Sequence, residues 1–337
     1  MRRVVVDADV LGRERTGDET YVRNLLRELA PLASDAGIGL VAVTRRPDLV
    51  PAGVEPVEVR TRVQELRMAF SLPRELRRLD AALCHTQYAL PLHPPCPCVV
   101  TVHDLSFARE PALMGRKDRL VFRRVVPGAV RRAARVLTVS ERTKRDLIEL
   151  CDVAPEKVVV TPNGVDPAFT PGPGSHDYVL SVGAIQSRKN QLAALDAAAA
   201  VGLPLVVAGP EKDPGLAAEL RRRGARLEGH VELGRLVELY RGAACLVQAS
   251  RFEGFGLPVL EAMACGTPVV AVPEPALREV AGKAAVVVPE ERLAEGIRQA
   301  LAERDRLAVA GLERASGFTW RASAERTLAV YREILGT

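Results

Sequence analysis

Short runs of β-branched and other apolar residues alternate along the chain with longer stretches in which apolar residues recur every three or four positions. This alternation predicts a parallel sheet with crossover helices, because each type of run matches the period of one element. A helix is expected over 20–32, and a second over 141–150 after Ser140, a suitable N-cap. The strands expected in the first half are 4–7, 40–43, 57–59, 81–84, 99–102, 136–139 and 158–161.

A break separates this series from a second one. The stretch 161–167 and the Pro-Gly-Pro-Gly run at 171–174 combine turn residues typical of a linker. A second α/β domain is expected beyond it, with helices that begin near 190, 214, 233 and 257 and a last helix over 321–335. Its strands are expected at 178–182, 205–208, 226–227, 245–247, 268–271 and 285–288.

Composition fits two ordinary globular domains. The chain has 337 residues, of which 47% are hydrophobic and 26% charged, and this length predicts roughly two domains. No apolar run approaches the ~18 residues of a membrane span. Asp7 and Asp9 interrupt the first valine run, which favours a strand over a signal peptide. The six scattered cysteines indicate a reducing compartment, so we expect a cytoplasmic location.

Positive charge is concentrated in the first half. The segment 115–146 carries 11 basic and 3 acidic residues, although the whole chain has a net charge of only +5. One interpretation is a solvated helix face in an arginine-rich chain. The other is a patch for an anionic acceptor or for anionic lipids at the inner face of a membrane. Nucleic acid fits poorly, because aromatic residues do not interleave the basic run.

The stretch 253–268 carries the strongest chemical pattern. Gly254 and Gly256 allow close approach of a ligand to the backbone, and Pro258 suits the first turn of a helix. Amides at the start of that helix would suit a phosphate. Glu253 precedes this anion site and Glu261 follows it. Both glutamates can be solvated, but Glu261 lies in an apolar helix and needs a partner, such as a pair of ligand hydroxyls.

Two other strand ends in the second half carry candidate residues. After the strand 178–182, Gly183 leads to Arg188 and Lys189, a pair of cations suited to a diphosphate. The alternative is a plain basic helix start. Gly209 ends the strand 205–208 and is weak evidence alone. Ligands bind beyond the carboxyl ends of the strands in open α/β sheets.

In the first half, His103 follows the strand 99–102 and precedes Asp104. The residues alone leave two interpretations open, a functional histidine and a structural one. The glycine fingerprint of dinucleotide-binding proteins, the Gly-Lys-Ser/Thr phosphate loop and metal-ligand spacing are all missing from the sequence. A dehydrogenase is therefore a distant alternative.

Taken together, these stretches resemble glycosyltransferase family 4, a family of retaining enzymes with the two-domain GT-B fold. The resemblance covers nearly the whole chain and looks closest to the mannosyltransferase-like branch. It implies an α/β fold of two Rossmann-like domains, 1–165 on the acceptor side and 166–317 for the nucleotide sugar, with a C-terminal helix, 318–337, that crosses back to the first. The matching stretches are 253–268, Gly183 with 188–190, 102–104, 161–166, 229–231 and 318–320.

The resemblance also implies roles for single residues. Glu261 would hold the ribose hydroxyls, Glu253 the donor sugar, and Arg188 and Lys189 the diphosphate, while His103 would face the reaction centre. Glu253, His103, Arg188 and Lys189 are therefore the predicted catalytic residues. The other predicted donor contacts are Gly17, Gly183, Gly209, Val231, Gly254, Phe255, Gly256 and Leu257; the acceptor side would include Asp18, Tyr88 and Asp104.

One stretch departs from the family pattern. Many relatives carry a glycine pair where this chain has Gly17-Asp18-Glu19, which puts amide contact to phosphate from that loop in doubt.

The resulting hypothesis is a metal-independent hexosyltransferase without a cofactor. It would move a sugar, with mannose favoured, from GDP-mannose or a UDP-sugar to a glycan or lipid-linked acceptor in surface polysaccharide or glycolipid synthesis. The alternatives are a nucleotide-sugar epimerase or phosphorylase on the same scaffold, and a two-lobed sugar-binding protein without catalysis.

Overall fold

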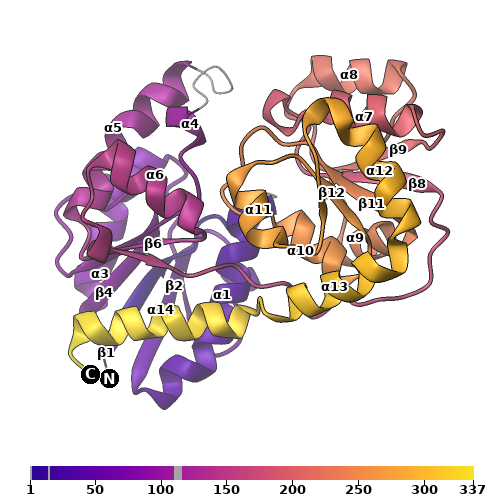
Figure 1. Cartoon of the computed structure of the whole chain (residues 1–337). Coiled ribbons are helices and arrows are strands. Elements are labelled where there is room, and N and C mark those ends of the chain that lie inside the picture. Colours follow the sequence, from indigo (N-terminus) through magenta and orange to yellow (C-terminus); the bar gives the residue numbers. More distant parts are fainter. Residues whose placement is uncertain (1, 14–15, 110–115) are drawn as a thin grey trace. The chain divides into compact units, whose positions relative to one another are not determined.

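The structure, a computed structural model, describes residues 2–13, 16–109 and 116–337, and the side chains of residues 16 and 116–122 lie outside this description. The chain divides into two compact units (Figure 1). Unit 1 comprises residues Met1–Gly164 and Trp320–Thr337, and unit 2 comprises Val165–Thr319. The sequence placed the corresponding boundaries at 165 and 317. Each unit is described by itself below.

The described residues of unit 1 form a seven-stranded sheet in which all neighbouring strands are parallel, in the order β3-β2-β1-β4-β5-β6-β7. The order reverses at β1, which lies between β2 and β4, so side chains at the ends of β1 and β4 lie at a topological switch point. The strands are β1 Arg2–Asp7, β2 Ile38–Thr44, β3 Glu55–Glu58, β4 Ala81–Gln87, β5 Cys98–Val102, β6 Arg135–Thr138 and β7 Val158–Val160.

Helices connect the strands of unit 1. The side chain of Ser140 accepts a hydrogen bond from the Thr143 amide at 3.0 Å, which confirms the predicted N-cap. The helices are α1 Thr16–Asp35, α2 Gln64–Leu66, the π turn η2 Arg67–Ser71, α3 Leu72–Arg78, α4 Ser106–Arg109, α5 Arg116–Arg132, α6 Glu141–Cys151 and α14 Trp320–Leu335, with 3-10 turns at Pro47–Leu49 and Pro155–Lys157.

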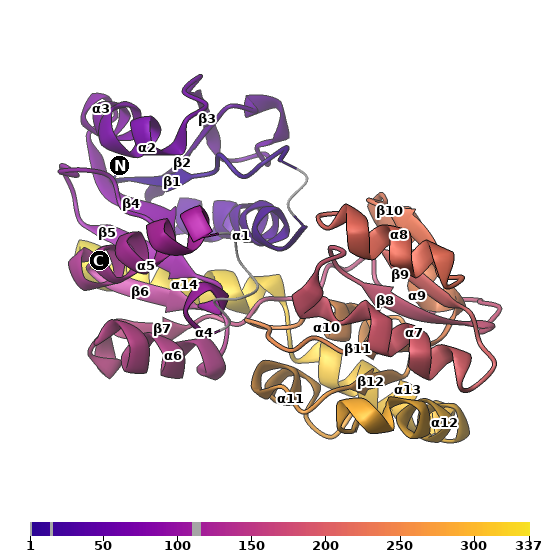
Figure 2. The same ribbon diagram turned by 90° about the horizontal axis from the view of Figure 1, so that it is seen from above.

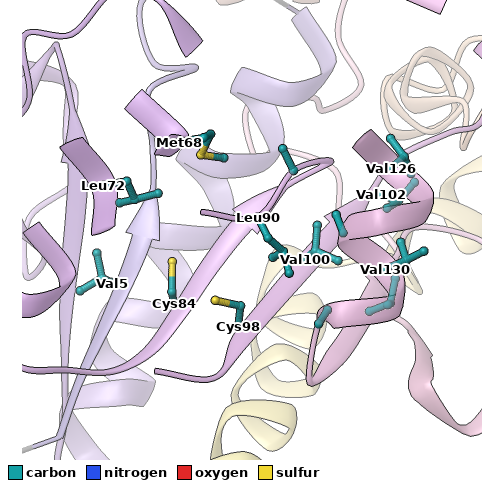
Figure 3. Packing of buried hydrophobic residues seen from close by; sticks show 14 of the residues in the cluster. Val5, Met68, Leu72, Cys84, Leu90, Cys98, Val100, Val102, Val126 and Val130 are labelled. Atoms are coloured by element: carbon teal, nitrogen blue, oxygen red, sulfur yellow. The ribbon is translucent and has the colours of Figure 1, made fainter. Parts of the chain in front are cut away.

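The core of unit 1 lies between the sheet and the helices that follow β3 and β5. Met68 and Leu72 pack in one buried cluster with Val5, Cys84 and Val100 (Figure 3). The valine-rich strands are buried on both faces, as expected for a parallel sheet. All six cysteines are free thiols, and Cys98 begins β5.

The last helix, α14, belongs to unit 1 and packs against α1. A series of hydrogen bonds between buried side chains joins α14 to the sheet. The Tyr331 hydroxyl of α14 lies 2.5 Å from Nδ1 of His85, and Nε2 of His85 lies 2.7 Å from the hydroxyl of Thr101. The Thr101 hydroxyl is also 3.0 Å from that of Tyr21 on α1. These contacts hold α14, α1, β4 and β5 together, and they give each of these four buried polar side chains a partner.

The described residues of unit 2 form a six-stranded parallel sheet in the order β10-β9-β8-β11-β12-β13 (Figure 2). Its strands are β8 Tyr178–Val182, β9 Leu205–Ala208, β10 Arg226–Gly229, β11 Ala243–Gln248, β12 Val269–Ala271 and β13 Val286–Val287. Its helices are α7 Gln191–Ala199, α8 Pro214–Arg222, α9 Leu233–Gly242, α10 Leu257–Ala264, α11 Pro275–Ala281, α12 Leu293–Ala302 and α13 Arg304–Ser316, with 3-10 turns at Ser187–Lys189 and Glu290–Arg292.

The predicted fold class is confirmed, with two parallel α/β sheets of the Rossmann type. Every predicted strand exists, and most bounds differ by one to three residues. The sequence pattern did not predict the helical segment 64–78 or the helices α4, α11, α12 and α13. Among the described residues, no helix is both long enough and apolar enough to cross a membrane.

Candidate active site

Three neighbouring strands of unit 2 end at the same edge of the sheet. In the order β9-β8-β11, Gly209 follows β9, Gly183 follows β8, and the loop 249–256 follows β11. Gly209 has φ +152°, and a Cβ atom there would lie 2.1 Å from the carbonyl oxygen of Gly183. Since no side chain fits at that distance, the glycine lets the two strand ends approach each other closely. The structure therefore brings these predicted residues together.

Glu253 is the centre of a polar cluster at this edge. The Nζ atom of Lys189 donates to Oε1 of Glu253 at 2.5 Å, and Nη1 of Arg188 lies 3.4 Å from Oε2. Arg188 also donates to the carbonyl oxygen of Phe252 at 3.0 Å. The amide of Gln248, the last residue of β11, donates to Oε1 of Glu253 at 2.7 Å. Residues that lie about 65 positions apart in the sequence thus share one site.

The two cations keep Glu253 ionised. Burial alone would raise the pKa of its carboxyl group, but Lys189 and Arg188 outweigh burial and lower the pKa to about 2. Only 6% of Glu253 is exposed, so its charge is balanced by these partners and not by water. A carboxylate with this pKa accepts hydrogen bonds at neutral pH and does not act there as a general acid.

The loop after Glu253 leads into α10 with a geometry that suits an anion. Gly256 precedes the helix with φ +108°, and Pro258 lies in the first turn. Gly256, at the N-cap position, has no side chain that could cap α10, whereas α6 and α8 are capped by the side chains of Ser140 and Asp213. Amides of a first turn without a side-chain cap, together with the helix dipole, favour a negatively charged ligand.

Glu261 on α10 has one strong protein partner, which the sequence analysis missed. The hydroxyl of Tyr240, a buried residue of α9, donates to Oε2 of Glu261 at 2.6 Å. Burial raises the pKa of Glu261 to about 7, against the lowering effect of the Tyr240 hydrogen bond. Glu261 as a whole residue is 9% exposed. It is a buried group that ionises near neutral pH, and such groups cluster at functional sites.

Val231, one of the predicted donor contacts, follows β10 and is partly exposed. The Gly209 amide donates to the carbonyl oxygen of Gly229 at 2.7 Å, which joins the end of β10 to the end of β9. Val231 therefore lies two residues beyond this contact. Gly254, Phe255 and Leu257 lie in the loop and the first turn of α10, and Phe255 is buried against Phe318.

His103 occupies the end of β5 in unit 1. Its Nε2 atom lies 2.9 Å from Oε1 of Gln87, at the end of β4, and its ring meets those of Tyr21 and Tyr88 at centroid distances of 4.7 and 5.7 Å. Burial lowers the pKa of His103, against the raising effects of Asp18 and Asp104. The imidazole is thus neutral at pH 7, held on one edge by an amide.

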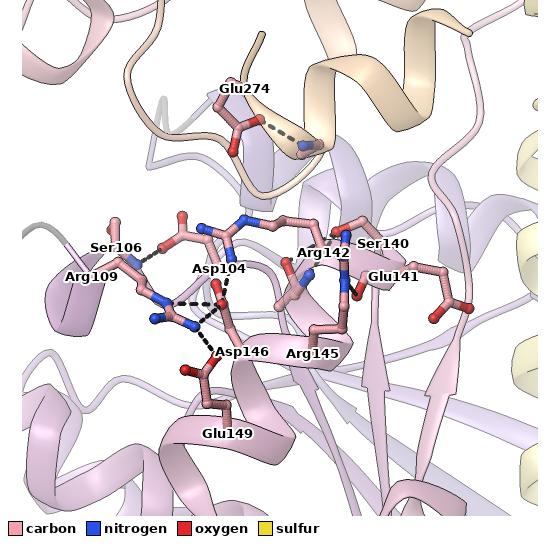
Figure 4. Close-up of polar contacts among 12 residues, drawn as sticks. Asp104, Ser106, Arg109, Ser140, Glu141, Arg142, Arg145, Asp146, Glu149 and Glu274 are labelled. Carbon is pink, nitrogen blue, oxygen red and sulfur yellow. Dashed lines mark hydrogen bonds and ion pairs between the residues drawn. The ribbon is translucent and has the colours of Figure 1, made fainter.

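The other predicted residues of unit 1 lie near His103 in the sequence or in the fold. Asp104 lies two residues before α4 and accepts a hydrogen bond at 2.8 Å from the amide of Ser106, the first residue of that helix (Figure 4). Tyr88 has φ +59°, a left-handed backbone that is uncommon for an aromatic residue. Gly17 and Asp18 are in the first turn of α1, and a Cβ atom at Gly17 would meet nothing within 4 Å. This position therefore does not require glycine for packing.

Two buried ion-pair clusters in unit 1 were not predicted. Asp146 on α6 is fully buried and pairs with Arg109 and Arg142 (Figure 4). At the end of β1, Asp7 pairs with Arg67 of the π turn, which is 3% exposed. The segment 115–146 is described only in part, because residue 115 and the side chains of 116–122 lie outside the described residues. Sequence periodicity does not show which charged residues are buried.

The predicted site residues fall into two groups. His103, Gly17, Asp18, Tyr88 and Asp104 belong to unit 1, and all the others belong to unit 2. Among the described residues, no group of three or more His, Cys, Asp or Glu side chains is arranged to hold a metal ion.

The chain matches the models of two known protein families. Residues 15–169 match the model of "Glycosyltransferase Family 4", and residues 167–313 match that of "Glycosyl transferases group 1". The chain is 28% identical over 266 residues to the O-antigen chain mannosyltransferase B of Escherichia coli, covering 69% of this chain and 70% of that protein. It is 32% identical over 284 residues to a D-inositol 3-phosphate glycosyltransferase of Frankia alni, covering 71% of this chain and 69% of that protein.

The fold is similar to that of a solved sucrose-phosphate synthase from Thermosynechococcus elongatus. The TM-score is 0.81 at 20% sequence identity, and the match covers 100% of both chains. This likeness extends over both units. The chain spans about 70% of the length of either curated relative.

Proposed function

Because the chain belongs to glycosyltransferase family 4, we propose that it moves a hexosyl group from a nucleotide diphosphate sugar to a glycan or lipid-linked acceptor, with retention at the anomeric carbon. The two family models together extend from residue 15 to residue 313, so both units take part in the match. Mannose is the favoured sugar, supplied by GDP-mannose or a UDP-sugar. The mannosyltransferase name of one relative supports this choice.

The observation that carries the proposal is the cluster of Lys189, Arg188 and Glu253 beside the start of α10. Two cations and one buried carboxylate leave a net positive charge at a helix N-terminus that has no side-chain cap. Such a site suits a diphosphate, because a forked guanidinium, a compact ammonium and backbone amides can bind phosphate oxygens together. The amides of Phe255, Gly256 and Leu257 are the proposed backbone contacts.

The hard step is loss of the nucleoside diphosphate, on which negative charge grows as the bond to the sugar breaks. Lys189 and Arg188 would stabilise that charge with little reorganisation, because Glu253 already holds both side chains in place. The ionised Glu253 would also accept hydrogen bonds from donor-sugar hydroxyls. The leaving phosphate oxygen would take the acceptor proton on the same face of the sugar, so no protein general base is assigned.

Glu261 is the proposed ribose contact. A carboxylate oxygen can accept more than one hydrogen bond, and a vicinal diol supplies two donors. Tyr240 already donates to Oε2, which fixes the carboxylate and leaves Oε1 for the ribose. The two glutamates would therefore have separate tasks, and they are not a glycosidase pair.

In unit 1, we keep His103 as a candidate contact of the transferred sugar and Asp18, Tyr88 and Asp104 as acceptor-side candidates. Gly17 stays a candidate phosphate contact. Since the His103 ring is neutral and its Nε2 edge faces Gln87, its proposed role is hydrogen bonding. Independence from metal ions and cofactors, a cytoplasmic location, and membrane contact through 115–146 also stay predictions.

The test is an acceptor-dependent assay with EDTA present. Purified protein is incubated with a panel of nucleotide sugars and with glycan or lipid-linked acceptors, and release of nucleoside diphosphate is measured. Transfer with the anomeric configuration of the donor supports the proposal. An epimerase would convert the donor without acceptor, a phosphorylase would need orthophosphate, and a binding protein would show no turnover, so each result would contradict it.

A further inference from the structure

Two histidines lie on neighbouring strands of unit 1, and they differ in the hydrogen bonds that their rings form. In His85 of β4, Nδ1 lies 2.5 Å from the Tyr331 hydroxyl and Nε2 lies 2.7 Å from the Thr101 hydroxyl. In His103, which follows β5, Nε2 lies 2.9 Å from Oε1 of Gln87. Among the described residues, none forms a hydrogen bond with Nδ1 of His103. The His103 ring therefore has one open edge, whereas both ring nitrogens of His85 have partners.

The strand register explains why Gln87 reaches His103. Gln87, the last residue of β4, lies opposite Thr101 of β5 in the sheet. Side chains two positions apart along a strand point to the same face. His85 and Gln87 therefore share one face of the sheet, and Thr101 and His103 share it at the end of β5. The two rows meet, so the amide of Gln87 lies against the imidazole of His103.

Two aromatic side chains fix the orientation of the His103 ring. The Tyr21 ring meets it edge-on at a centroid distance of 4.7 Å and an interplanar angle of 80°, and the Tyr88 ring lies at 5.7 Å. The Tyr21 hydroxyl is itself 3.0 Å from that of Thr101. His103 keeps 9% of its surface exposed, against 2% for His85. The ring is thus held in place without being sealed in the core.

The contact with Gln87 decides which nitrogen of His103 carries the proton. The ring is neutral, because burial lowers its pKa against the raising effects of Asp18 on α1 and Asp104 after β5. His85 is neutral as well, since burial lowers its pKa to about 3. A neutral imidazole has one N–H and one lone pair. The oxygen Oε1 of Gln87 can only accept, so Nε2 carries the proton and the lone pair lies on Nδ1.

We propose that Gln87 is a positioning residue that holds His103 in the Nε2–H tautomer, and that Nδ1 accepts a hydrogen bond from a hydroxyl group of the sugar substrate. A hydroxyl is the partner because it supplies a proton, whereas an ionised carboxylate or phosphate has none to offer to a lone pair. The identity of this ligand rests on the proposed function. The tautomer does not, since it belongs to the protein without a ligand.

Nitrogen NMR of isotopically labelled histidine side chains reads the tautomer in the ligand-free chain at pH 8. His103→Gln identifies the His103 signals by their loss. We expect the proton on Nε2 in the wild type and in Gln87→Glu, which keeps an accepting oxygen. Gln87→Leu has no acceptor and should show a mixture of both tautomers. The matched control is Gln64→Leu, at an exposed position of α2, which should give the wild-type spectrum.

Sugar transfer supplies the second readout. Gln87→Leu should lower kcat/KM by about tenfold, because the hydrogen bond from the substrate hydroxyl is weakened. Gln87→Glu should be close to the wild type at pH 8, with the acid limb of kcat/KM moved to higher pH. The added carboxylate joins Asp18 and Asp104 in raising the pKa of His103, and protonation removes the lone pair. A merely structural role would not move this limb.

Monodeoxy analogues of the donor sugar show whether a hydroxyl is the partner. The analogue that lacks the contacted hydroxyl should react about tenfold more slowly than the intact donor with the wild type, and it should lose little with Gln87→Leu. Equal losses in both proteins for every analogue would contradict the contact at Nδ1.

The proposal has clear contrary results. A proton on Nδ1 in the wild type, or the same spectrum in the wild type and Gln87→Leu, would overturn the role of Gln87. An altered tautomer with wild-type kcat/KM would overturn the contact with a sugar hydroxyl. If Gln87→Leu fails to fold, as judged by its melting, the wild type and Gln87→Glu decide. If the tautomers are as expected but the wild type transfers no sugar, the proposed function fails and the role of Gln87 stands.

Discussion

Replacing Glu261 by glutamine should stabilise the protein while it weakens donor binding. The carboxylate is buried on α10 and accepts the Tyr240 hydrogen bond. Burial raises its pKa from 4.5 to about 7. Since one pKa unit corresponds to about 1.36 kcal/mol, the ionised form costs the folded state about 3 kcal/mol. Glutamine keeps an oxygen for Tyr240 and carries no charge.

The contribution of Glu261 to the free energy of unfolding depends on pH, because its pKa differs between the folded and unfolded states. The folded-state pKa of Glu261 lies above its unfolded value, so the protonated residue favours folding and this contribution is lost as pH rises from 4.5 through 7. At pH 8 the full cost is present in the wild type, and at pH 5 only about 1 kcal/mol of it remains. The free energy of unfolding of the variant should therefore exceed that of the wild type by about 3 kcal/mol at pH 8 and by about 1 kcal/mol at pH 5.

Urea denaturation at both pH values, followed by circular dichroism, measures this gain. Calorimetric titration with GDP and UDP on the same samples should show a loss of affinity of at least about tenfold, because a charged acceptor for the ribose is removed. Glu291→Gln, at an exposed position, is the control and should change neither quantity. A variant that is destabilised at pH 8, or equally affected at both pH values, would refute the assignment of a buried, costly carboxylate.

The remaining predictions concern the same unit. Lys189→Ala should lower turnover by about 10²-fold or more if Lys189 stabilises the leaving group, and it should also lower the melting temperature, because the buried Glu253 carboxylate loses its main cation; wild-type turnover would remove Lys189 from the mechanism. Tyr240→Phe removes the hydrogen bond that lowers the Glu261 pKa, so the acid limb of kcat/KM against pH should move to higher pH; an unmoved limb would contradict this. Gly209→Ala should destabilise by about 2 kcal/mol or more, because its Cβ would clash with the backbone of Gly183. Gly234→Ala, where a Cβ meets nothing within 4 Å, should not be destabilised, and urea denaturation of both variants checks the difference.

Much of the fold was predictable because parallel strands that are buried on both faces appear as continuous apolar runs. The runs at 205–208 and 99–102 are such cases, and the structure places β9 and β5 there. The linker was also visible from its proline and glycine residues. The segment 64–78 escaped prediction because its arginines and its exposed Leu66 and Phe70 obscure the helical period. Helix α11 was missed because it begins with Glu274 and Pro275 inside an apparent loop.

The candidate site was predictable in part. Glycine spacing and the Arg188-Lys189 pair marked loops at strand ends, and the structure brings Lys189 to Glu253. The role of Tyr240 was not predictable, because a tyrosine in an amphipathic helix is usually a core residue and only the fold shows its hydroxyl facing Glu261. Gln248 was missed for the same reason, as a polar residue at the end of a strand has no sequence signal for its partner.

The central claim is that the cluster of Lys189, Arg188 and Glu253 at the start of α10 binds a nucleoside diphosphate. Calorimetric titration of the wild type and Lys189→Ala with GDP and with UDP, at pH 8 and in EDTA, tests it most directly. We expect one site on the wild type for at least one of the two nucleotides, and affinity at least about tenfold lower in the variant, because a charge-assisted contact to phosphate is lost. No binding of either nucleotide to the wild type, or equal binding to both proteins, would contradict the claim.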